Sequence, residues 1–299
     1  MNVGTRLTCM MLTLAGIVLL GAGCAGKNTA ITVISREDGS GTRSAFVELL
    51  GIAADGVDRT TELAEISNST SVVLQSVADN GNAIGYISLG SLSDVVKAVP
   101  VDGVAPTAEN VQAGLYSVSR PFNVVTRGPV ETASPLVADF LAFALSEDGQ
   151  KIVEEKGYIR AAGGADYQGG GLTGTIVVAG STSVAPVMEA LADRYKELNQ
   201  GVVIEIQQTG SSAGMTSTLE GASHIGMASR ELSSRELEQG LVPTVLALDG
   251  IAIIVNRQNG LEGLSSAQVR DIYTGAIQDW SGTQGQPVGQ EQTVTVPAE

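Results

Sequence analysis

Three turns rich in glycine, serine and threonine each follow a short apolar run and precede an apolar pattern of helical period. They lie within Arg36–Arg43, Ala179–Ser183 and Thr209–Gly214. Free backbone N–H groups and the partial positive charge at a helix start bind anions, and hydroxyl groups add further donors. A single turn of this kind is ordinary helix capping by Ser or Thr. Three of them at the carboxyl ends of strands, where open α/β sheets bind ligands, favour an oxyanion site.

The first turn carries charged side chains. Arg36 offers a planar guanidinium whose donors match an oxyanion. Asp38 stands two residues further on, where its carboxylate can hold that guanidinium in place. We expect the Glu37 carboxylate to be solvated. Arg43 is open to two interpretations, a second contact with the anion or a solvated residue on the first helical turn.

Other kinds of site find little support. None of the turns fits GxxxxGK[ST] or G-x-S-x-G, the patterns of nucleotide P-loops and of serine hydrolases. One His, His224, and two Cys are too few for a His/Cys metal centre or for His-based acid–base catalysis. A net charge of -15, from 17 basic and 32 acidic residues, argues against nucleic acid as a partner. We therefore expect no metal and no cofactor.

The N-terminus has the pattern of a secretory signal. Arg6 supplies a positive charge, Met10–Leu20 an apolar run, and Leu20–Cys24 resembles a bacterial lipobox, whose Cys becomes the lipidated N-terminus. The alternatives are an ordinary signal peptide and a single spanning helix, for which the apolar run is short. We expect residues 1–23 to be the signal. Cys24 would then carry acyl chains that tether an extracytoplasmic protein to the cell membrane.

Short apolar runs alternate with helical patterns along the rest of the chain, which predicts α/β architecture. The expected strands are Ile31–Ser35, Ala83–Ser88, Val95–Val101, Leu115–Val125, Ile176–Val178, Val202–Gln207, Ile225–Ala228 and Val245–Val255. Apolar residues at three- and four-residue spacing predict helices. The expected helices cover residues 45–50, 69–79, 136–144, 184–198, 215–219 and 266–273. Each of the three turns therefore lies between an expected strand and an expected helix.

A glycine-rich stretch, Ala161–Gly174, separates the two halves of the chain. Its composition is typical of a flexible linker, and we expect a flexible joint there. The tail after Trp280 is polar except near Val294 and Val296, where one more edge strand could form.

Several longer runs resemble the high-affinity phosphate-binding protein of bacterial phosphate ABC importers. The runs that carry the resemblance are Ile31–Thr42, Val178–Pro186, Gly210–Gly214, Ile225–Glu231, Ala247–Ala252 and Ile272–Trp280. Each run is short, but their occurrence together in one chain makes the resemblance specific. It covers residues 30–285 approximately.

The order of the segments differs from that of the family. In the family the segment similar to Ile176–Trp280 comes first and the one similar to Ile31–Ile159 follows, whereas the order here is inverted. The glycine-rich stretch lies where the family's termini would be joined. We interpret the chain as a circular permutant, which the surface position of domain termini permits. The alternative is two fused halves that assemble only with a partner chain.

The resemblance implies a two-lobe α/β clamp of the periplasmic-binding-protein kind, type II, which closes on its ligand. One lobe would hold residues 30–100 with 256–299, and the other residues 116–168 with 175–247. The linker 161–174 would join the permuted halves. The crossovers between the lobes would lie at Val245–Val255 and around residues 101–120.

The resemblance also implies ligand contacts. The residues that match phosphate-contacting positions of the family are Arg36, Ser40, Gly41, Thr42, Thr182, Ser183 and Ser211. Arg36 matches the arginine that meets the phosphate, with Asp38 as its partner. Ser229 is a further expected contact that departs from the pattern. Some members carry an Asp there, which accepts a proton from bound phosphate and excludes sulfate.

The function that the resemblance implies is that of an extracytoplasmic lipoprotein and not of an enzyme. The protein would capture inorganic phosphate between its lobes and deliver it to the permease subunits of an ABC importer. Two alternatives stay open. One is a binder of another tetrahedral oxyanion, such as sulfate, molybdate or a phosphonate. The other is a phosphatase-like enzyme, for which the sequence offers no convincing nucleophile–base pair.

Overall fold

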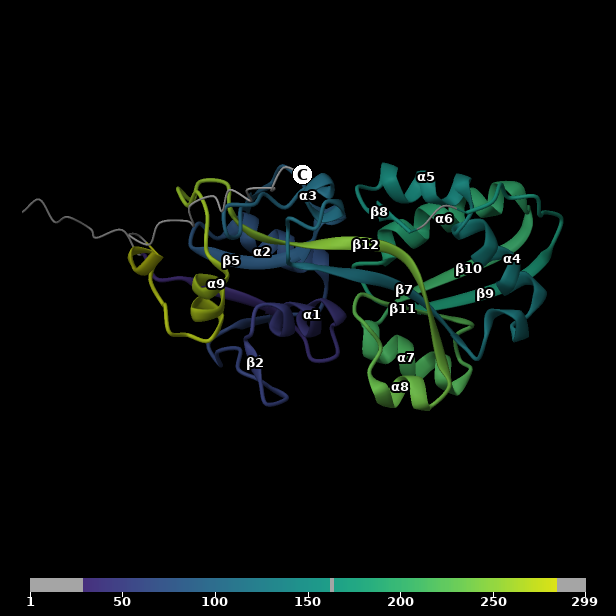
Figure 1. Ribbon diagram of the computed structural model, residues 1–299, viewed down its shortest axis with the longest axis horizontal. Coiled ribbons are helices and arrows are strands. Elements are labelled where there is room, and N and C mark those ends of the chain that lie inside the picture. The colour runs from purple at the N-terminus through teal and green to yellow at the C-terminus, as the bar shows by residue number, and fades with distance from the viewer. Residues whose placement is uncertain (1–28, 162–163, 284–299) are drawn as a thin grey trace, which may run out of the picture.

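Two lobes lie side by side and are joined by two long strands (Figure 1). The computed structural model describes residues 29–161 and 164–283. The long strands are β7 (Ser119–Arg127) and β12 (Leu241–Asn256), which pair antiparallel and pass from one lobe into the other. They link the strands of both lobes into one sheet of order β10-β9-β11-β7-β12-β5-β1-β4.

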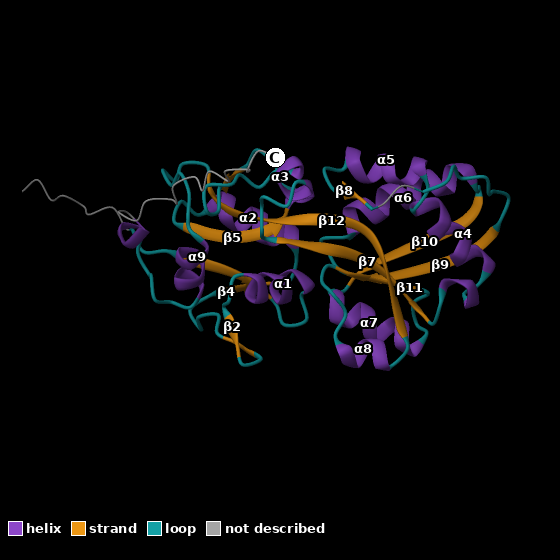
Figure 2. Ribbon diagram, in the orientation of Figure 1, coloured by secondary structure: helices purple, strands orange, loops and turns teal. Residues whose placement is uncertain are grey.

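Lobe A, on the right in Figure 1, is built on β9 (Thr173–Gly180). This strand runs parallel to β10 (Gly201–Gln208) and to β11 (Ile225–Ala228). The other elements of the lobe are η2 (Val130–Thr132), α4 (Pro135–Ala144), α5 (Glu147–Glu155), β8 (Ile159–Arg160), α6 (Ala185–Leu198), α7 (Ser211–Glu220) and α8 (Ser234–Glu238). In Figure 2, α4, α5 and α6 lie on one side of the sheet, and α7 and α8 lie on the other.

Lobe B is built on β1 (Thr32–Arg36), which runs parallel to β4 (Glu65–Ser67) and to β5 (Ala83–Ser88). Its other elements are α1 (Gly41–Leu49), β2 (Ala53–Ala54), β3 (Val57–Asp58), α2 (Thr70–Asp79), η1 (Leu89–Ser91), β6 (Val96–Val99), α3 (Ala108–Gln112), α9 (Ser266–Tyr273) and η3 (Trp280–Thr283). Both ends of the described chain lie here, because Ala30 forms an antiparallel bridge with Asp279.

Each lobe buries a hydrophobic core of its own. In lobe A, Phe140 packs edge-on against Tyr195, with ring centroids 5.1 Å apart. In lobe B, Phe46 stacks on Tyr86 at 3.9 Å and meets Tyr273 edge-on at 4.7 Å. Burial of apolar surface is the main term that stabilises a fold, so each lobe is held together largely by its own residues. This arrangement suits hinge closure, in which two bodies move about their connecting strands.

Most expected elements are present, with shifts at their ends. β5, β11 and α9 have the predicted bounds, and α9 begins with a capping box between Ser265 and Gln268. β12 begins at Leu241 and not at Val245, because Leu241 continues the ladder opposite Arg127 of β7. The sequence did not indicate α5, β4 or the hairpin of β2 with β3, whose polar or very short runs carry little periodicity.

The described part of the glycine-rich stretch contacts lobe A at several points. Its Tyr167 hydroxyl donates to Asp139 of α4 over 2.5 Å, and the Tyr167 ring meets that of Phe143 at 5.2 Å. A Cβ on Gly164 would lie 1.9 Å from the Leu145 carbonyl oxygen, and one on Gly169 would lie 2.3 Å from Asp139 Oδ1. The stretch therefore packs closely on lobe A, and its last two residues already belong to β9.

Some expectations lie outside the described residues. These are the signal at residues 1–23, the lipidated Cys24 and the edge strand near Val294. Within residues 29–161 and 164–283, no helix has the length and apolar character needed to cross a membrane.

Candidate oxyanion-binding site

Four helix starts converge where the two lobes meet, and a hydroxyl side chain marks each of them. Thr42 lies in the first turn of α1 and Thr70 begins α2, both in lobe B. Ser183 precedes α6 and Ser211 begins α7, both in lobe A. All four side chains are buried. Converging helix starts point several free N–H groups and partial positive charges at one place, which is an arrangement that binds anions.

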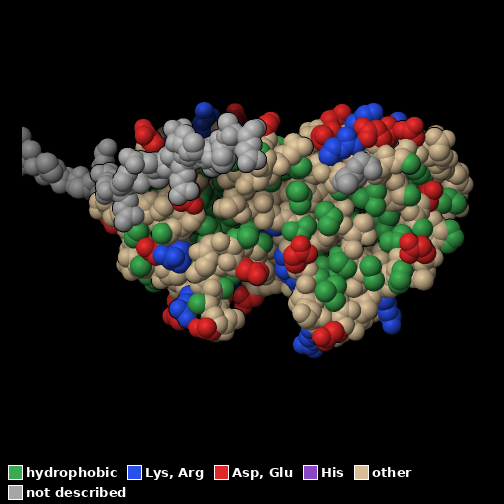
Figure 3. All heavy atoms as spheres, in the orientation of Figure 1, with side chains coloured by type: hydrophobic (Ala, Val, Ile, Leu, Met, Phe, Trp, Pro, Cys, Tyr) green, Lys and Arg blue, Asp and Glu red, His purple; other side chains and the backbone are tan. Residues whose placement is uncertain are grey.

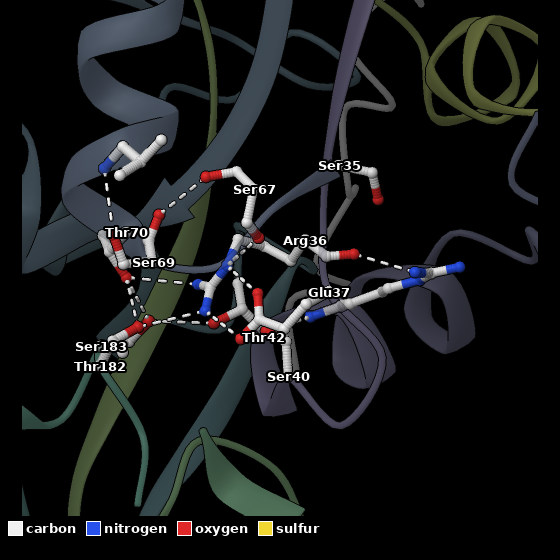
Figure 4. Close-up of polar contacts among 12 residues, drawn as sticks. Ser35, Arg36, Glu37, Ser40, Thr42, Ser67, Ser69, Thr70, Thr182 and Ser183 are labelled. Carbon is white, nitrogen blue, oxygen red and sulfur yellow. Dashed lines mark hydrogen bonds and ion pairs between the residues drawn. The ribbon is translucent and has the colours of Figure 1, made fainter. Parts of the chain in front are cut away.

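The hydroxyl groups of Thr42, Thr70, Thr182 and Ser183 touch one another across the boundary between the lobes (Figure 4), and we call them the hydroxyl cluster. Ser183 Oγ lies 2.9 Å from Thr42 Oγ1 and 3.0 Å from Thr70 Oγ1. Thr182 Oγ1 lies 3.2 Å from Thr70 Oγ1. Each hydroxyl can donate or accept, so the cluster can reorient its protons toward a ligand oxygen.

A second group of serines adjoins Gly41. Ser181 Oγ donates to Ser229 Oγ over 2.9 Å, and the Ser229 backbone N–H donates to Ser211 Oγ over 3.3 Å. A Cβ added to Gly41 would lie 2.4 Å from Ser211 Oγ and 2.7 Å from Ser229 Oγ. Glycine is therefore required at position 41, because lobe B approaches the serines of lobe A too closely for any side chain.

Arg36 ends β1 and directs its guanidinium at the hydroxyl cluster (Figure 4). The side chain is 2% exposed. Its Nη2 donates to Thr182 Oγ1 of lobe A over 3.2 Å, and its Nη1 donates to Thr70 Oγ1 of lobe B over 3.4 Å. A buried guanidinium with donors toward both lobes supplies the fixed positive charge that an oxyanion needs.

The prediction that Asp38 is the partner of Arg36 is wrong. Glu37, and not Asp38, holds the guanidinium, with Oε2 2.8 Å from Nε and Oε1 2.8 Å from Nη2. The Asp38 side chain is 97% exposed and pairs with Arg43 at 2.9 Å. The chain turns at this point, since the Ser40 N–H donates to the Glu37 carbonyl over 3.2 Å. That turn folds Glu37 back over Arg36 and leaves Asp38 in solvent.

Arg43 follows neither interpretation that the sequence left open. Its Nε lies 2.7 Å from Asp58 Oδ2, and its Nη1 donates to the Arg36 carbonyl over 2.9 Å. Arg43 thus braces the loop behind Arg36. Ser40, another expected contact, uses its Oγ to cap α1 by accepting the Arg43 N–H over 3.4 Å.

Two members of the site were missed by the sequence analysis. Thr70 follows the turn Ser67–Ser69, which joins β4 to α2 in the same strand–turn–helix arrangement as the three turns singled out. That turn contains no glycine, so a search that also accepted serine-rich turns would have found it. Ser181 was passed over in favour of its neighbours, although its Oγ also accepts from the Ser183 N–H at 3.2 Å.

Tyr86 holds the end of β1 through its hydroxyl group. Its hydroxyl oxygen accepts from the Arg36 N–H over 3.1 Å and lies 2.9 Å from Ser35 Oγ. Burial raises the pKa of Tyr86 to about 12, so the phenol is neutral at physiological pH. The Arg36 backbone is therefore held at its N–H by a neutral phenol and at its carbonyl by the Arg43 guanidinium.

A second buried ion pair lies where the crossover strands meet lobe B. Arg120 of β7 and Asp249 of β12 are directly opposite in the ladder, and Arg120 Nη2 lies 3.1 Å from Asp249 Oδ2. Asp249 Oδ1 also accepts from Ser88 Oγ at 2.8 Å and from the Leu89 N–H at 3.1 Å. The pair ties both crossovers to the end of β5.

The described residues offer nothing comparable for a metal. Residues 29–161 and 164–283 contain no group of three or more His, Cys, Asp and Glu side chains that could hold a metal ion. His224 is exposed, and its Nδ1 accepts from the Val177 N–H over 2.9 Å.

The chain is similar to proteins of one named group. A family model described as a PBP superfamily domain matches residues 23–148 and 165–298. The phosphate-binding protein PstS 2 of Streptococcus agalactiae is 44% identical over 283 residues, which is 91% of this chain and 96% of that protein. PstS of Bacillus subtilis is 40% identical over 136 residues, only 45% of this chain and 43% of that protein.

A solved structure agrees over most of the fold. The crystal structure of the phosphate-binding protein of a phosphate ABC transporter from Streptococcus pneumoniae TIGR4 is 43% identical. It covers 85% of this chain and all of that one, with a TM-score of 0.69. The expected two-lobe type II fold of periplasmic binding proteins is confirmed. The chain belongs to the PBP superfamily and, within it, to the family of the PstS phosphate-binding proteins.

Proposed function

We propose that this protein captures inorganic phosphate between its lobes and delivers it to the permease subunits of an ABC importer. The observation that carries the proposal is the set of contacts between the lobes, in which Arg36 and Thr70 of lobe B meet Thr182 of lobe A. Relatives named as phosphate-binding proteins, alike over most of their length, support the choice of ligand. No bond is made or broken in such a cycle.

Neutral donors and one guanidinium would hold the ligand. The proposed contacts are Arg36, Gly41, Thr42, Thr70, Thr182, Ser183, Ser211 and Ser229, from both lobes. Ser40 would contribute through its backbone, because its hydroxyl caps α1. Asp38 is left out of the proposed set, because it is exposed and bonded to Arg43. Closure of the lobes would remove the ligand from water. Hydrogen bonds to an anion are stronger in the protein interior than in water.

Calorimetric titration of the purified protein with phosphate tests the proposal. We expect saturable binding of one phosphate per chain that competing sulfate, molybdate or methylphosphonate displaces only in large excess. Preferential binding of one of those competitors would show that the ligand is another oxyanion. The uncharged Ser229 favours this alternative. Turnover of a phosphomonoester by the same metal-free sample would instead identify an enzyme.

We propose further that the chain is a circular permutant of the segment order found in PstS proteins such as that of Bacillus subtilis. The streptococcal relative matches from end to end, whereas the Bacillus subtilis relative matches over less than half of either chain. Two halves in exchanged order would limit a collinear match in this way. The lobes would comprise residues 30–100 with 256–299 and residues 116–168 with 175–247. A chain that carries residues 173–283 first and residues 29–161 second should bind phosphate with unchanged affinity.

We also propose that the protein is extracytoplasmic and lipid-anchored through Cys24. The support is the apolar run Met10–Leu20, followed by small residues up to the cysteine. In cells grown with labelled palmitate, the wild type should take up acyl label and a Cys24→Ser variant should not, while phosphate binding stays unchanged. A wild type without acyl label would refute the anchor and leave the ligand assignment untouched.

A further inference from the structure

Glu37 is the carboxylate that bonds Arg36 at the mouth of the proposed phosphate site (Figure 4). Among residues 29–161 and 164–283, no other carboxylate is hydrogen-bonded to that guanidinium. The side chain is 25% exposed, so it lies at the border between the buried site and solvent. A Cβ on Gly210, just before Ser211, would lie 3.6 Å from Glu37 Oε1. Glu37 therefore stands between Arg36 and the Ser211 turn of lobe A.

The carboxylate leaves one edge of the guanidinium facing the hydroxyl cluster. Glu37 takes the edge formed by Nε and Nη2, at 2.8 Å for each bond. The edge formed by Nη1 and Nη2 faces Thr70 and Thr182. One nitrogen, Nη2, is thus shared between Glu37 Oε1 and Thr182 Oγ1. A ligand oxygen received by that nitrogen would lie next to a carboxylate oxygen.

The charges in the site balance. Thr42, Thr70, Thr182, Ser183, Ser211 and Ser229 are neutral, and the charge of Arg36 is offset by that of Glu37. A carboxylate beside an oxyanion repels it, and the repulsion grows in proportion to the charge of the ligand. A carboxylate also only accepts hydrogen bonds, so it can be paired favourably with a ligand that carries a proton. Phosphate carries at least one proton at neutral pH, whereas sulfate carries none.

We propose that Glu37 sets the charge and protonation of the oxyanion that this site accepts. It penalises fully ionised tetrahedral dianions such as sulfate, and it accepts a hydrogen bond that a P–OH group of phosphate donates. This role rests on the proposed phosphate site and adds a specificity residue to it, in a site where lobe A contributes no carboxylate among the contacts described above.

The test compares Glu37→Gln with Asp38→Asn. Both substitutions remove one negative charge from the same turn and keep the shape of the side chain, but Asp38 is exposed and pairs with Arg43. Phosphate and sulfate affinities are measured by calorimetry for the wild type and both variants. We expect the ratio of phosphate affinity to sulfate affinity to fall at least tenfold in Glu37→Gln. In Asp38→Asn the ratio should stay within twofold of the wild-type value.

A pH series sharpens the result. Neutralising Glu37 should help the doubly charged form of phosphate most, so the gain in phosphate affinity should be larger at pH 8.5 than at pH 5.5. Equal changes for phosphate and sulfate at both pH values would show that Glu37 only orients Arg36, and would overturn the proposal. If Glu37→Gln fails a thermal-unfolding check, Glu37→Ala replaces it under the same criteria. A wild type that binds no phosphate refutes the proposed function itself, a result separate from any change in the ratio.

Discussion

Arg36 at the binding site and Arg120 at the crossover strands are both buried guanidinium groups, yet their surroundings differ. Each side chain is 2% exposed and bonded to one carboxylate. Glu37 is partly exposed, whereas Asp249 is wholly buried and accepts from Ser88 and Leu89 as well. Water can therefore take over the bonds of Glu37 but not those of Asp249. The first pair suits exchange with a ligand, and the second suits fixing of the strands.

The surface reinforces this contrast. Figure 3 shows the molecule narrowing between the lobes on one side, with acidic and basic side chains at that boundary. The protein as a whole has a net charge of -15, yet the buried contacts proposed for the ligand are hydroxyls, backbone groups and Arg36. Groups close to the proposed site therefore matter more for anion binding than the net charge of the protein, since charges beyond a Debye length are largely screened.

The largest expected effect comes from breaking the Arg120–Asp249 pair. Asp249→Ala leaves the Arg120 charge buried without its carboxylate, which costs about 3–5 kcal/mol of unfolding free energy. Urea denaturation followed by circular dichroism measures the loss. The matched control is the double variant Arg120→Met with Asp249→Leu, which should recover most of it because no charge then stays buried. A loss below about 1 kcal/mol in the single variant would remove the distinction between the two pairs.

The next largest effect comes from removing the charge of Arg36. Arg36→Ala removes a charged, buried donor, and we expect phosphate affinity to fall well over tenfold, since such a bond contributes roughly 1.5–3 kcal/mol. Its unfolding free energy should fall less than that of Asp249→Ala, because water can solvate the Glu37 left behind. Calorimetry and urea denaturation measure the two quantities. Arg270→Ala, at an exposed arginine paired with Asp271, is the control and should change neither.

A smaller effect follows from the close approach of the lobes at Gly41. A methyl group there would meet Ser211 Oγ at 2.4 Å and hold the lobes apart. We expect Gly41→Ala to weaken phosphate binding about tenfold, or about 1.4 kcal/mol, with little change in unfolding free energy. Gly81→Ala, where a Cβ has open space, is the comparison. Equal affinities for the two variants would mean that the lobes need not approach this closely.

A further effect concerns the pH dependence of stability. Burial raises the pKa of Asp249 from 3.8 to about 6, although Arg120 acts against the shift. The folded state therefore holds the proton more tightly than the unfolded state. The contribution of Asp249 is fully present below pH 4 and is lost as the pH rises through about 6. Between pH 4.5 and 7, the wild type should lose more unfolding free energy than Asp249→Asn. Parallel pH profiles from urea denaturation would contradict this.

The sequence predicted the parts of the fold that depend on local patterns. Short apolar runs predict β5 and β11, apolar residues at helical spacing predict α9, and the resemblance adds the two-lobe arrangement. α5 was missed because Ile152 and Val153 are its only large apolar residues. The close approach of Gly164 and Gly169 to lobe A could not be predicted, since composition alone does not indicate where glycines contact a neighbouring element.

In the site, too, local motifs predicted some residues, and contacts between distant segments determine the others. Arg36, Thr42, Thr182, Ser183 and Ser211 lie together as the motifs suggest. The choice between Glu37 and Asp38 as the partner of Arg36 depends on how the chain turns after β1, which residue types alone do not fix. Thr70 enters the site because the start of α2 meets Ser183, in the turn before α6, which is a contact between segments far apart in the chain.

The bridge between Ala30 and Asp279 has a mechanical consequence. The Ile31 N–H donates to the Gln278 carbonyl, and the Trp280 N–H donates to the Thr29 carbonyl. The start of the described chain is therefore hydrogen-bonded to its end within lobe B. A force applied through the N-terminus therefore enters lobe B alone. A tether at that end would therefore hold lobe B and leave lobe A free to move about β7 and β12.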